Sequence, residues 1–490
     1  MSQGAQTSGA APARRSGVSA ALPLIALAAL PVLLVREGAR PITDPDAQWH
    51  VLLGKAVLSG VSLATDVDPL STRTTVPWVF HQWLPEVAAA FADERVGWWG
   101  VGWLAHVGRL CLLLALWWVC RAEAERLAAV LALAAALLGT SMSLGPRPQL
   151  VGLCFLVVTI GAWRATSRDG RPRWWLVPLT WIWACSHGTW VLGLVIGLVQ
   201  VTAIGIDRRR ASALAGQGWR NELAGASTVT LMLVPAFGAL VVLLTPVGPR
   251  LLTAQQHIAQ VSDLVTEWQR PTLAQVPTML TWAVAGLVAV AMTFGWKRQS
   301  WSAVDLATWA MACVCLMAYQ RTVAVAAILL APLLAARLGG WLRRPRPPAS
   351  RADRWVPAVV AVASAAILAV LLPQVASQPG GVPTGLTSAL SGLPTGTVVV
   401  NDERLGGWLL ATQPQLTPTV DTRFEAYGRT SMQDHLRLVT AATGWGDRLA
   451  ATGATAVLLP TQTPLVTVLV GDPGWSSLGQ DAGFTLLQRR

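Results

Sequence analysis

Long apolar runs recur along most of the chain, and they predict membrane-spanning helices. A helix rises about 1.5 Å per residue, so roughly 20 apolar residues cross a hydrocarbon layer of about 30 Å. The runs occupy residues 18–35, 96–119, 127–145, 149–163, 174–186, 189–206, 224–245, 278–295, 303–319, 322–338 and 355–374. We therefore predict an α-helical polytopic membrane protein with about 11 transmembrane helices.

The apolar stretch over residues 174–206 is too long for one crossing. A single helix of this length would measure about 50 Å. The polar sequence SHGT interrupts it at residues 186–189. We expect two helices, one short and one longer, that meet at His187 and Gly188 on the outer side.

Composition supports a membrane protein and argues against a soluble enzyme. Hydrophobic residues make up 53% of the 490 residues and charged residues only 13%, whereas soluble domains carry roughly a quarter charged residues. All six cysteines lie in apolar runs or at their edges. They therefore predict neither a disulfide framework nor a thiolate metal site.

The net charge of +12 sets the orientation and does not indicate nucleic-acid binding. More than half of the 37 Lys and Arg residues fall in short segments on one side of the predicted membrane, as the positive-inside rule requires for the cytoplasmic side. Residues 1–16 are then a cytoplasmic N-terminal tail, and the run that follows is a retained helix rather than a cleaved signal peptide. We expect no nucleic-acid partner.

The predicted organisation has a membrane part and a small outer domain. Residues 17–374 form the transmembrane domain, with a large first outer loop at 36–95. A Pro/Gly-rich linker follows, and residues 375–490 contain short β-branched runs (TVVVN, GGWLLAT, TPTVDTR, ATAVLLP, FTLLQRR) and a polar helical stretch. This pattern predicts an extracytoplasmic α/β domain, and it lacks a glycine-rich phosphate loop.

The segment PITDPDAQWH at the start of the first outer loop is the strongest candidate for a functional site. Asp44 can cap a helix whose first turn contains Pro45, and this helix is too short to span, so we place it along the outer interface. Capping does not explain Asp46 and His50, which stand four residues apart on one helical face. We interpret them as site residues.

Two further segments of the same loop carry candidate residues. ATDVDPLST contains Asp66 and Asp68, which fit a turn as well as a site. WVFHQWLPE contains His81 and Glu86, and a histidine beside tryptophans at an interface is also explained by packing. Both explanations stay open from the sequence.

Arginines on the outer side run against the topological bias. Arg147 lies between two prolines in GPRPQ, and Arg321 lies at the outer end of a predicted span. A guanidinium can bind phosphate through two parallel hydrogen bonds, although a snorkelling arginine at a stiff turn is the alternative for Arg147. His187 and Glu267 lie on the same side, each with a structural explanation available.

Carboxylates, histidines and arginines on the outer face suit transfer chemistry on a lipid-phosphate substrate. A carboxylate can take the proton of an attacking hydroxyl. An arginine, or a divalent ion such as Mg²⁺ or Mn²⁺ with Asp44 and Asp46 as candidate ligands, can offset charge on the leaving phosphate. No cofactor is certain from the sequence.

Several motifs together resemble a bacterial group of membrane proteins placed with the GT-C glycosyltransferases. They are DPDAQWHVLLGKAVLSG, DPLSTRTTVPWVFHQWLPE, GPRPQL, HGTWVLGL, TEWQRP, GGWLLATQPQLTPTVDTRFEAYG and GATAVLLP, in this order. The resemblance covers nearly the whole chain and implies a GT-C-like fold in the bacterial plasma membrane. One departure is Gln82, where the resemblance leads us to expect a glutamate.

The resemblance also implies an activity. It implies an inverting transfer of a sugar from a polyprenyl-phosphate donor to a glycan, lipid or protein acceptor outside the cytoplasm. Asp44 and Asp46 would be the catalytic acids of the first outer loop, with Asp46 as the base. The loss of an acid at Gln82 bears on metal binding and on activity itself.

Two other functions fit parts of the sequence. A transporter or flippase for lipid-linked glycans would place charged residues deep within spans, where only His106 and Arg109 lie. A catalytically silent scaffold in cell-envelope synthesis would not need the acids to meet. The transferase requires Asp44, Asp46 and Arg147 to converge at one place.

Overall fold

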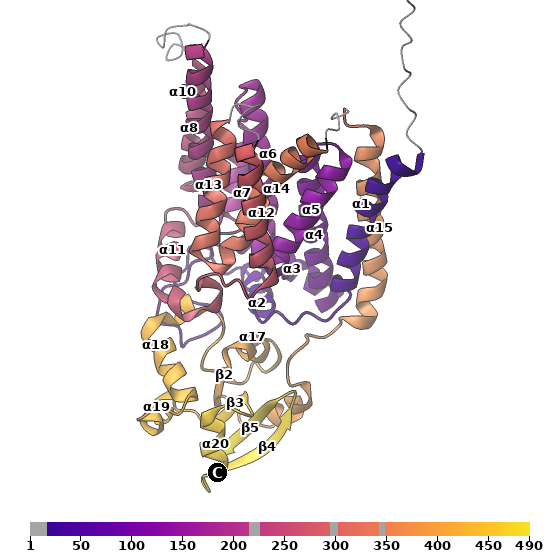
Figure 1. The fold of residues 1–490 in the computed structure, drawn as a ribbon. Helices are drawn as coiled ribbons and strands as arrows, with labels where there is room; N and C mark the ends of the chain where they lie inside the picture. Colours follow the sequence, from indigo (N-terminus) through magenta and orange to yellow (C-terminus); the bar gives the residue numbers. More distant parts are fainter. Residues whose placement is uncertain (1–16, 215–225, 295–301, 343–347) are drawn as a thin grey trace, which may run out of the picture.

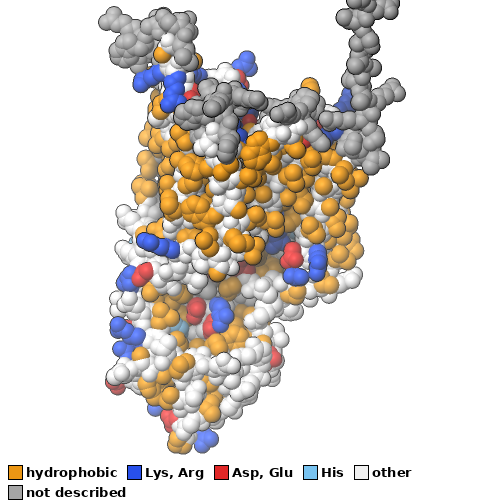
Figure 2. Space-filling view, viewed as in Figure 1, with side chains coloured by type: hydrophobic (Ala, Val, Ile, Leu, Met, Phe, Trp, Pro, Cys, Tyr) orange, Lys and Arg blue, Asp and Glu red, His pale blue; other side chains and the backbone are white. Residues whose placement is uncertain are grey.

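Apolar helices stand side by side in one layer, and a small mixed domain lies beyond one end of them (Figure 1). The computed structural model describes residues 17–214, 226–294, 302–342 and 348–490. The predicted cytoplasmic tail, residues 1–16, lies outside these ranges. In Figure 2 a broad apolar band covers the helical layer, as expected of a surface that faces lipid.

The layer contains helices from both halves of the chain. They are α1 (Gly17–Gly38), α4 (Trp98–Arg121), α5 (Arg126–Thr140), α6 (Gln149–Asp169), α7 (Leu176–Ala184), α8 (Trp190–Leu214), α10 (Ala226–Val242), α12 (Val276–Phe294), α13 (Ala303–Ala318), α14 (Val323–Trp341) and α15 (Arg351–Val375). Seven of the described helices are long and apolar enough to cross a membrane. The helical membrane fold is confirmed, whereas the count of eleven spans stays a prediction because α7 has only 9 residues.

The break predicted near His187 is present. Helix α7 ends at Ala184 and α8 begins at Trp190. A Cβ at Gly188 would lie 2.4 Å from the amide nitrogen of Gln255, so the turn is pressed against a neighbouring helix. The connecting residues thereby reach the end of the layer that faces the C-terminal domain, which we call the outer end because the sequence predicts it to lie outside.

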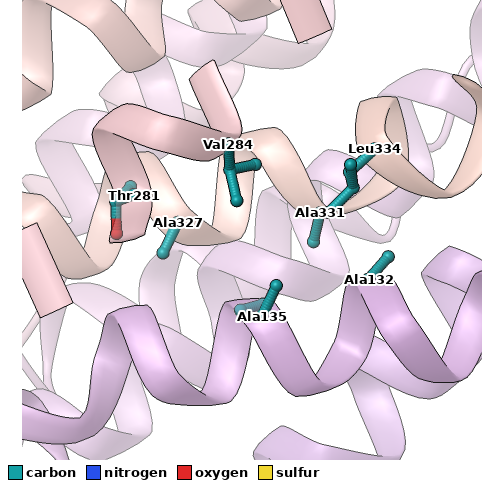
Figure 3. Close-up of a pocket in the computed structure, with 8 residues that line it drawn as sticks. Ala132, Ala135, Thr281, Val284, Ala327, Ala331 and Leu334 are labelled. Atoms are coloured by element: carbon teal, nitrogen blue, oxygen red, sulfur yellow. The ribbon is translucent and has the colours of Figure 1, made fainter. Parts of the chain in front are cut away.

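Small side chains let three helices of the layer pack closely. A Cβ on Gly139 of α5 would lie 2.6 Å from the Cβ of Ala327 in α14. Figure 3 shows the narrow apolar pocket between α5, α12 and α14, which is lined by Ala132, Ala135, Ala136, Thr281, Val284, Ala327, Ala331 and Leu334. Helices in lipid commonly associate through small residues that allow close packing, because the hydrophobic effect does not favour helix association there.

Short elements at the outer end of the layer carry the candidate site. They are α2 (Asp46–Leu58), α3 (Trp83–Val96), α11 (Arg250–Val261) and the 3-10 turns η1 (Ser141–Ser143), η2 (Ser262–Leu264), η3 (Thr266–Trp268) and η4 (Gln320–Thr322). Helices α2 and α3 pack on one another. Gly54 makes this possible, since a Cβ there would lie 2.0 Å from the backbone oxygen of Glu86.

The C-terminal domain has a five-stranded mixed sheet with strand order β2-β1-β3-β5-β4. Strand β1 is parallel to β2 and β3, while β5 is antiparallel to β3 and β4. The strands are β1 (Val398–Asn401), β2 (Thr417–Pro418), β3 (Ala456–Pro460), β4 (Trp475–Asp481) and β5 (Phe484–Arg489). The helical elements are η5 (Thr384–Leu386), α16 (Thr387–Ser391), α17 (Glu403–Thr412), α18 (Phe424–Val439), α19 (Trp445–Thr452) and α20 (Pro464–Val470).

This domain is α/β as predicted, with two local differences. GGWLLAT belongs to helix α17 and not to a strand, because Leu405, Trp408 and Leu409 recur at helical spacing and bury one face in the core of the domain. TPTVDTR pairs only over Thr417–Pro418; the chain then leaves the sheet and turns toward the membrane layer. The domain boundaries drawn from the sequence stay predictions, although α15 does end at Val375.

The C-terminal domain docks on the outer elements. Helix α17 packs on α2, and α18 packs on α11. A Cβ on Gly407 of α17 would lie 3.3 Å from the backbone of Pro45 and Trp49. The two parts therefore meet at the start of α2, which contains the first candidate acids.

Candidate functional site

Asp44, Asp46 and Arg147 converge at the outer end of the layer. The Nε of Arg147 donates to Asp44 Oδ2 at 2.6 Å, and its Nη1 lies 2.9 Å from Asp46 Oδ2. Figure 2 shows a hollow between the apolar band and the C-terminal domain, in which acidic, basic and histidine side chains lie together. The convergence that the transferase hypothesis requires is therefore present.

A third carboxylate completes the group around Arg147. Glu267 lies in η3, and its Oε1 accepts from Arg147 Nη1 at 2.6 Å. The other oxygen of Glu267 lies 3.7 Å from Nη1 of Arg321. Glu267 thus connects the two arginines that the sequence suggested for phosphate.

The start of α2 aims the two aspartates. The helix begins at Asp46, with Pro45 in a helical conformation before it, and Asp44 Oδ1 accepts from the backbone N–H of Asp46 at 3.1 Å. Asp44 therefore caps the first turn, as predicted. Gly145 leaves room for its second oxygen, because a Cβ there would lie 2.6 Å from Asp44 Oδ2.

Asp46 is held on both of its oxygens. Oδ1 accepts from the hydroxyl of Thr422 and, at 3.3 Å, from Trp49 Nε1, while Oδ2 faces Arg147. Burial raises the pKa of Asp46, against the opposite effect of Arg147. A buried carboxylate that keeps a raised pKa is a stronger base than an exposed one.

Arg321 and His187 form a second polar pair beside this group. Nη2 of Arg321 lies 3.2 Å from His187 Nε2, and the guanidinium lies 5.5 Å from the ring centre of Trp268. Burial, followed by the charge of Arg321, lowers the pKa of His187 well below its usual value. His187 is therefore neutral and accepts from the guanidinium.

His50, one helical turn after Asp46 in α2, pairs with Glu86 of α3. Nδ1 of His50 and Oε1 of Glu86 are 2.9 Å apart, and both side chains are almost wholly buried. Burial raises the pKa of Glu86 to about 8 and lowers that of His50 well below its usual range. At neutral pH both groups are uncharged and hydrogen-bonded to each other. The hydrogen bond offsets the cost of burying two polar side chains.

Asp68 ties the first outer loop to the C-terminal domain. Its Oδ1 accepts from Arg423 Nη1 at 2.8 Å, and Arg423 Nη2 donates to Asp421 Oδ2 at 2.7 Å. Tyr427 also donates to Asp421, at 2.9 Å. All three charged side chains are fully buried, so this group joins the first outer loop to the C-terminal domain.

The remaining loop residues have structural partners. His81 contacts the backbone oxygen of Val79 at 3.1 Å, and burial lowers its pKa to about 4. Asp66 pairs with Arg250 at the surface. Gln82 is buried at the N-terminal boundary of α3.

Sequence reasoning missed what the C-terminal domain adds. Thr422 contacts Asp46, and Glu425 of α18 lies close enough for the charge of Asp46 to contribute to its raised pKa. Burial raises the pKa of Glu425 to about 7. Both residues lie in DTRFEAYG, a segment that the resemblance singled out without assigning a role.

The aspartates were also candidate metal ligands. In the part of the chain that the structure describes, no group of three or more His, Cys, Asp or Glu side chains is placed to hold a metal ion. Asp44 and Asp46 instead direct one oxygen each at the guanidinium of Arg147. The position between the two aspartates is therefore already occupied by a positively charged side chain, that of Arg147.

With this geometry established, comparison with solved structures places the fold. The chain is similar to the oligosaccharyltransferase of Archaeoglobus fulgidus in its apo form, with a TM-score of 0.54 over 91% of this chain and 70% of that one. Its fold is similar to that of an oligosaccharyltransferase. This agrees with the GT-C-like fold expected from the resemblance.

Two further structures of the archaeal enzyme match equally well. One is AglB in complex with an inhibitory peptide and a dolichol-phosphate, with a TM-score of 0.56 over 91% of this chain and 70% of that one. The other carries a tethered acceptor peptide with the NVT sequon, with a TM-score of 0.56 over 90% and 69%. Sequence identity is 12% in all three matches, so the likeness concerns the fold. No protein-family model and no curated protein matches the sequence.

Proposed function

We propose that this chain is an inverting membrane glycosyltransferase that takes a sugar from a polyprenyl-phosphate donor and transfers it to an acceptor outside the cytoplasm. The observation that carries the proposal is the contact of Asp44, Asp46 and Arg147 at the outer end of a GT-C-like layer. A lipid-linked donor fits this position, because the sugar phosphate of a lipid lies at the membrane surface.

Asp46 is our choice for the base. In the proposed step the acceptor oxygen attacks the anomeric carbon, the bond from that carbon to the phosphate oxygen breaks, and the acceptor proton passes to Asp46. A carboxylate has about four acceptor positions, so Asp46 can bind this proton while Thr422 and Arg147 hold it. Its raised pKa supports the role.

Arg321 and His187 are our choice for the donor phosphate. Arg147 was the stronger candidate from the sequence, but two of its nitrogens are engaged by three carboxylates within 2.9 Å. Within the described ranges, Arg321 has one ion pair, a long one at 3.7 Å with Glu267. Its guanidinium can therefore offset the charge of the leaving phosphate, with His187 fixing its orientation.

The decisive experiment measures sugar release by purified protein in lipid. A panel of radiolabelled polyprenyl-phosphate sugars is offered with crude extracytoplasmic acceptor. We expect turnover with one donor, and a fall of at least about 100-fold for Asp46→Asn, the size of a general-base contribution. Asp44→Asn should lose activity by displacing Arg147.

Asp66→Asn provides the matched control. Asp66 lies in the same outer loop and also pairs with an arginine, but at the exposed surface. It should keep wild-type turnover. Undiminished activity in a folded Asp46→Asn protein would refute the proposed base, and no turnover with any donor would favour the transporter or the scaffold.

A further inference from the structure

Three carboxylates surround one guanidinium at the outer end of the layer. Asp44 Oδ2, Glu267 Oε1 and Asp46 Oδ2 lie 2.6, 2.6 and 2.9 Å from nitrogens of Arg147. The exposed fractions of the Asp44 and Asp46 side chains are 13% and 16%. Acidic groups this close and this buried require a cation between them.

The other oxygen of each aspartate already accepts hydrogen bonds from the chain. Asp44 Oδ1 accepts from the backbone N–H of Asp46. Asp46 Oδ1 accepts from Thr422 and Trp49. The remaining oxygen of each aspartate points at Arg147, so both side chains are aimed at one cation position.

A divalent metal would need that same position. Mg²⁺ takes six oxygen ligands at about 2.0–2.1 Å in a nearly octahedral arrangement. Arg147 instead offers planar N–H donors that suit carboxylates, and GPRPQ fixes its backbone between two prolines. Burial lowers the pKa of Arg147, but the three acids outweigh this and raise it above the ordinary value, so the charge is permanent.

We propose that the guanidinium of Arg147 takes the place of a divalent cation between Asp44, Asp46 and Glu267, and that the site works without a bound metal. The first half concerns the cation position alone. The second half rests on the proposed transferase function. The two halves have separate readouts.

Binding of Mn²⁺, followed by electron paramagnetic resonance, tests the cation position. The purified full chain is compared with Arg147→Ala and Arg147→Lys, each checked for folding by size-exclusion chromatography. We expect no saturable Mn²⁺ site in the wild type or in Arg147→Lys, which keeps the charge. Arg147→Ala should gain one Mn²⁺ per chain, and the added substitution Asp46→Asn should abolish it.

Arg250→Ala is the matched control, because it removes an outer arginine that pairs with an exposed aspartate. It should gain no Mn²⁺ site. Saturable Mn²⁺ binding by the wild type that Asp44→Asn removes would overturn the proposal. Failure of a folded Arg147→Ala protein to bind Mn²⁺ would overturn it as well.

Chelation tests the second half. If the wild type turns over a lipid-phosphate sugar, EDTA should leave its rate unchanged, and a loss restored by Mn²⁺ would overturn metal independence. Absence of turnover with every donor would count against the proposed function only. The Mn²⁺ measurements on the same proteins would still decide the cation position.

Discussion

Glu86 and His50 show how single residues adapt to burial beside the site. Each would be costly as an unpaired charge, and their shifted pKa values keep both neutral around pH 7. The sequence suggested both as supporting residues because they stand near the aspartates. The sequence did not indicate that His50 and Glu86 contact each other, or that Asp46 accepts a hydrogen bond from Thr422 instead.

The residue scale makes a prediction about pH. The pKa of Glu86 is raised from 4.5 to about 8 in the folded protein. The unfolded chain therefore releases this proton first, and Glu86 makes the free energy of unfolding fall by about 1.4 kcal/mol per pH unit between these values. His50, whose pKa is lowered, opposes this only below about pH 6.5.

When the pH is raised from about 6.5 to 8, the free energy of unfolding of Glu86→Gln should therefore increase by about 2 kcal/mol relative to that of the wild type. Thermal unfolding in detergent at both pH values measures this gain. Glu94→Gln is the control, because Glu94 is an exposed acid of the same helix. An equal difference in stability at both pH values would mean that Glu86 is ionised in the folded protein.

Residue identities in the site were predictable where local chemistry demanded them. Asp44 and Asp46 stood out as charges at the mouth of an apolar run, and Arg147 as an outer arginine between prolines. Thr422 did not, because a threonine in a polar segment is ordinary. Its contact with Asp46 joins positions 376 residues apart, and no local pattern encodes such a pairing.

At the scale of elements, the apolar helices were the most predictable and the sheet the least. In a membrane every backbone N–H and C=O needs a hydrogen-bond partner within the protein. Long apolar runs therefore predict helices. GGWLLAT stood among the strand-like runs of the sequence, yet it lies in helix α17, where Gly406 and Gly407 allow close packing. Its leucines and alanine favour a helix, and only one of its residues is β-branched.

The contact between α18 and the first outer loop makes a second prediction. Arg423, Asp68 and Asp421 are fully buried, and removing one partner of a buried pair costs about 3–5 kcal/mol. We therefore expect Arg423→Met to lower the unfolding free energy by this amount. It should also free the C-terminal domain from the layer, which limited proteolysis detects.

A matched pair of side chains provides the control. Arg429 and Asp263 also join α18 to the outer loops, at 2.7 Å, but both are about half exposed. Exposed pairs are worth about 0–1 kcal/mol, so Arg429→Met should change little. Equal losses in both variants would show that Arg423 has no special part in docking.

At the scale of the whole molecule, the site and the C-terminal domain share one end of the layer (Figure 1). The sequence predicts this end outside and the arginine-rich loops inside. In a variant without the native cysteines, Ser388→Cys of the C-terminal domain should react with an impermeant maleimide added to intact cells. Ser388 is exposed.

Ser167→Cys serves as the opposite reporter. Ser167 is exposed at the other end of α6, and it should react only after the membrane is opened. The reverse pattern would place the C-terminal domain in the cytoplasm. It would also separate the acids from any lipid-linked sugar on the outer leaflet.

The hydrogen bond from Thr422 to Asp46 has a consequence for the order of synthesis. Asp46 leaves the ribosome early and enters the membrane long before Thr422, which follows 376 residues later. Until the C-terminal domain has been translated and docked on α2, one oxygen of Asp46 lacks its hydroxyl donor. A chain that stalls or is clipped before this point carries every helix of the layer, but its Asp46 lacks the hydrogen bond from Thr422.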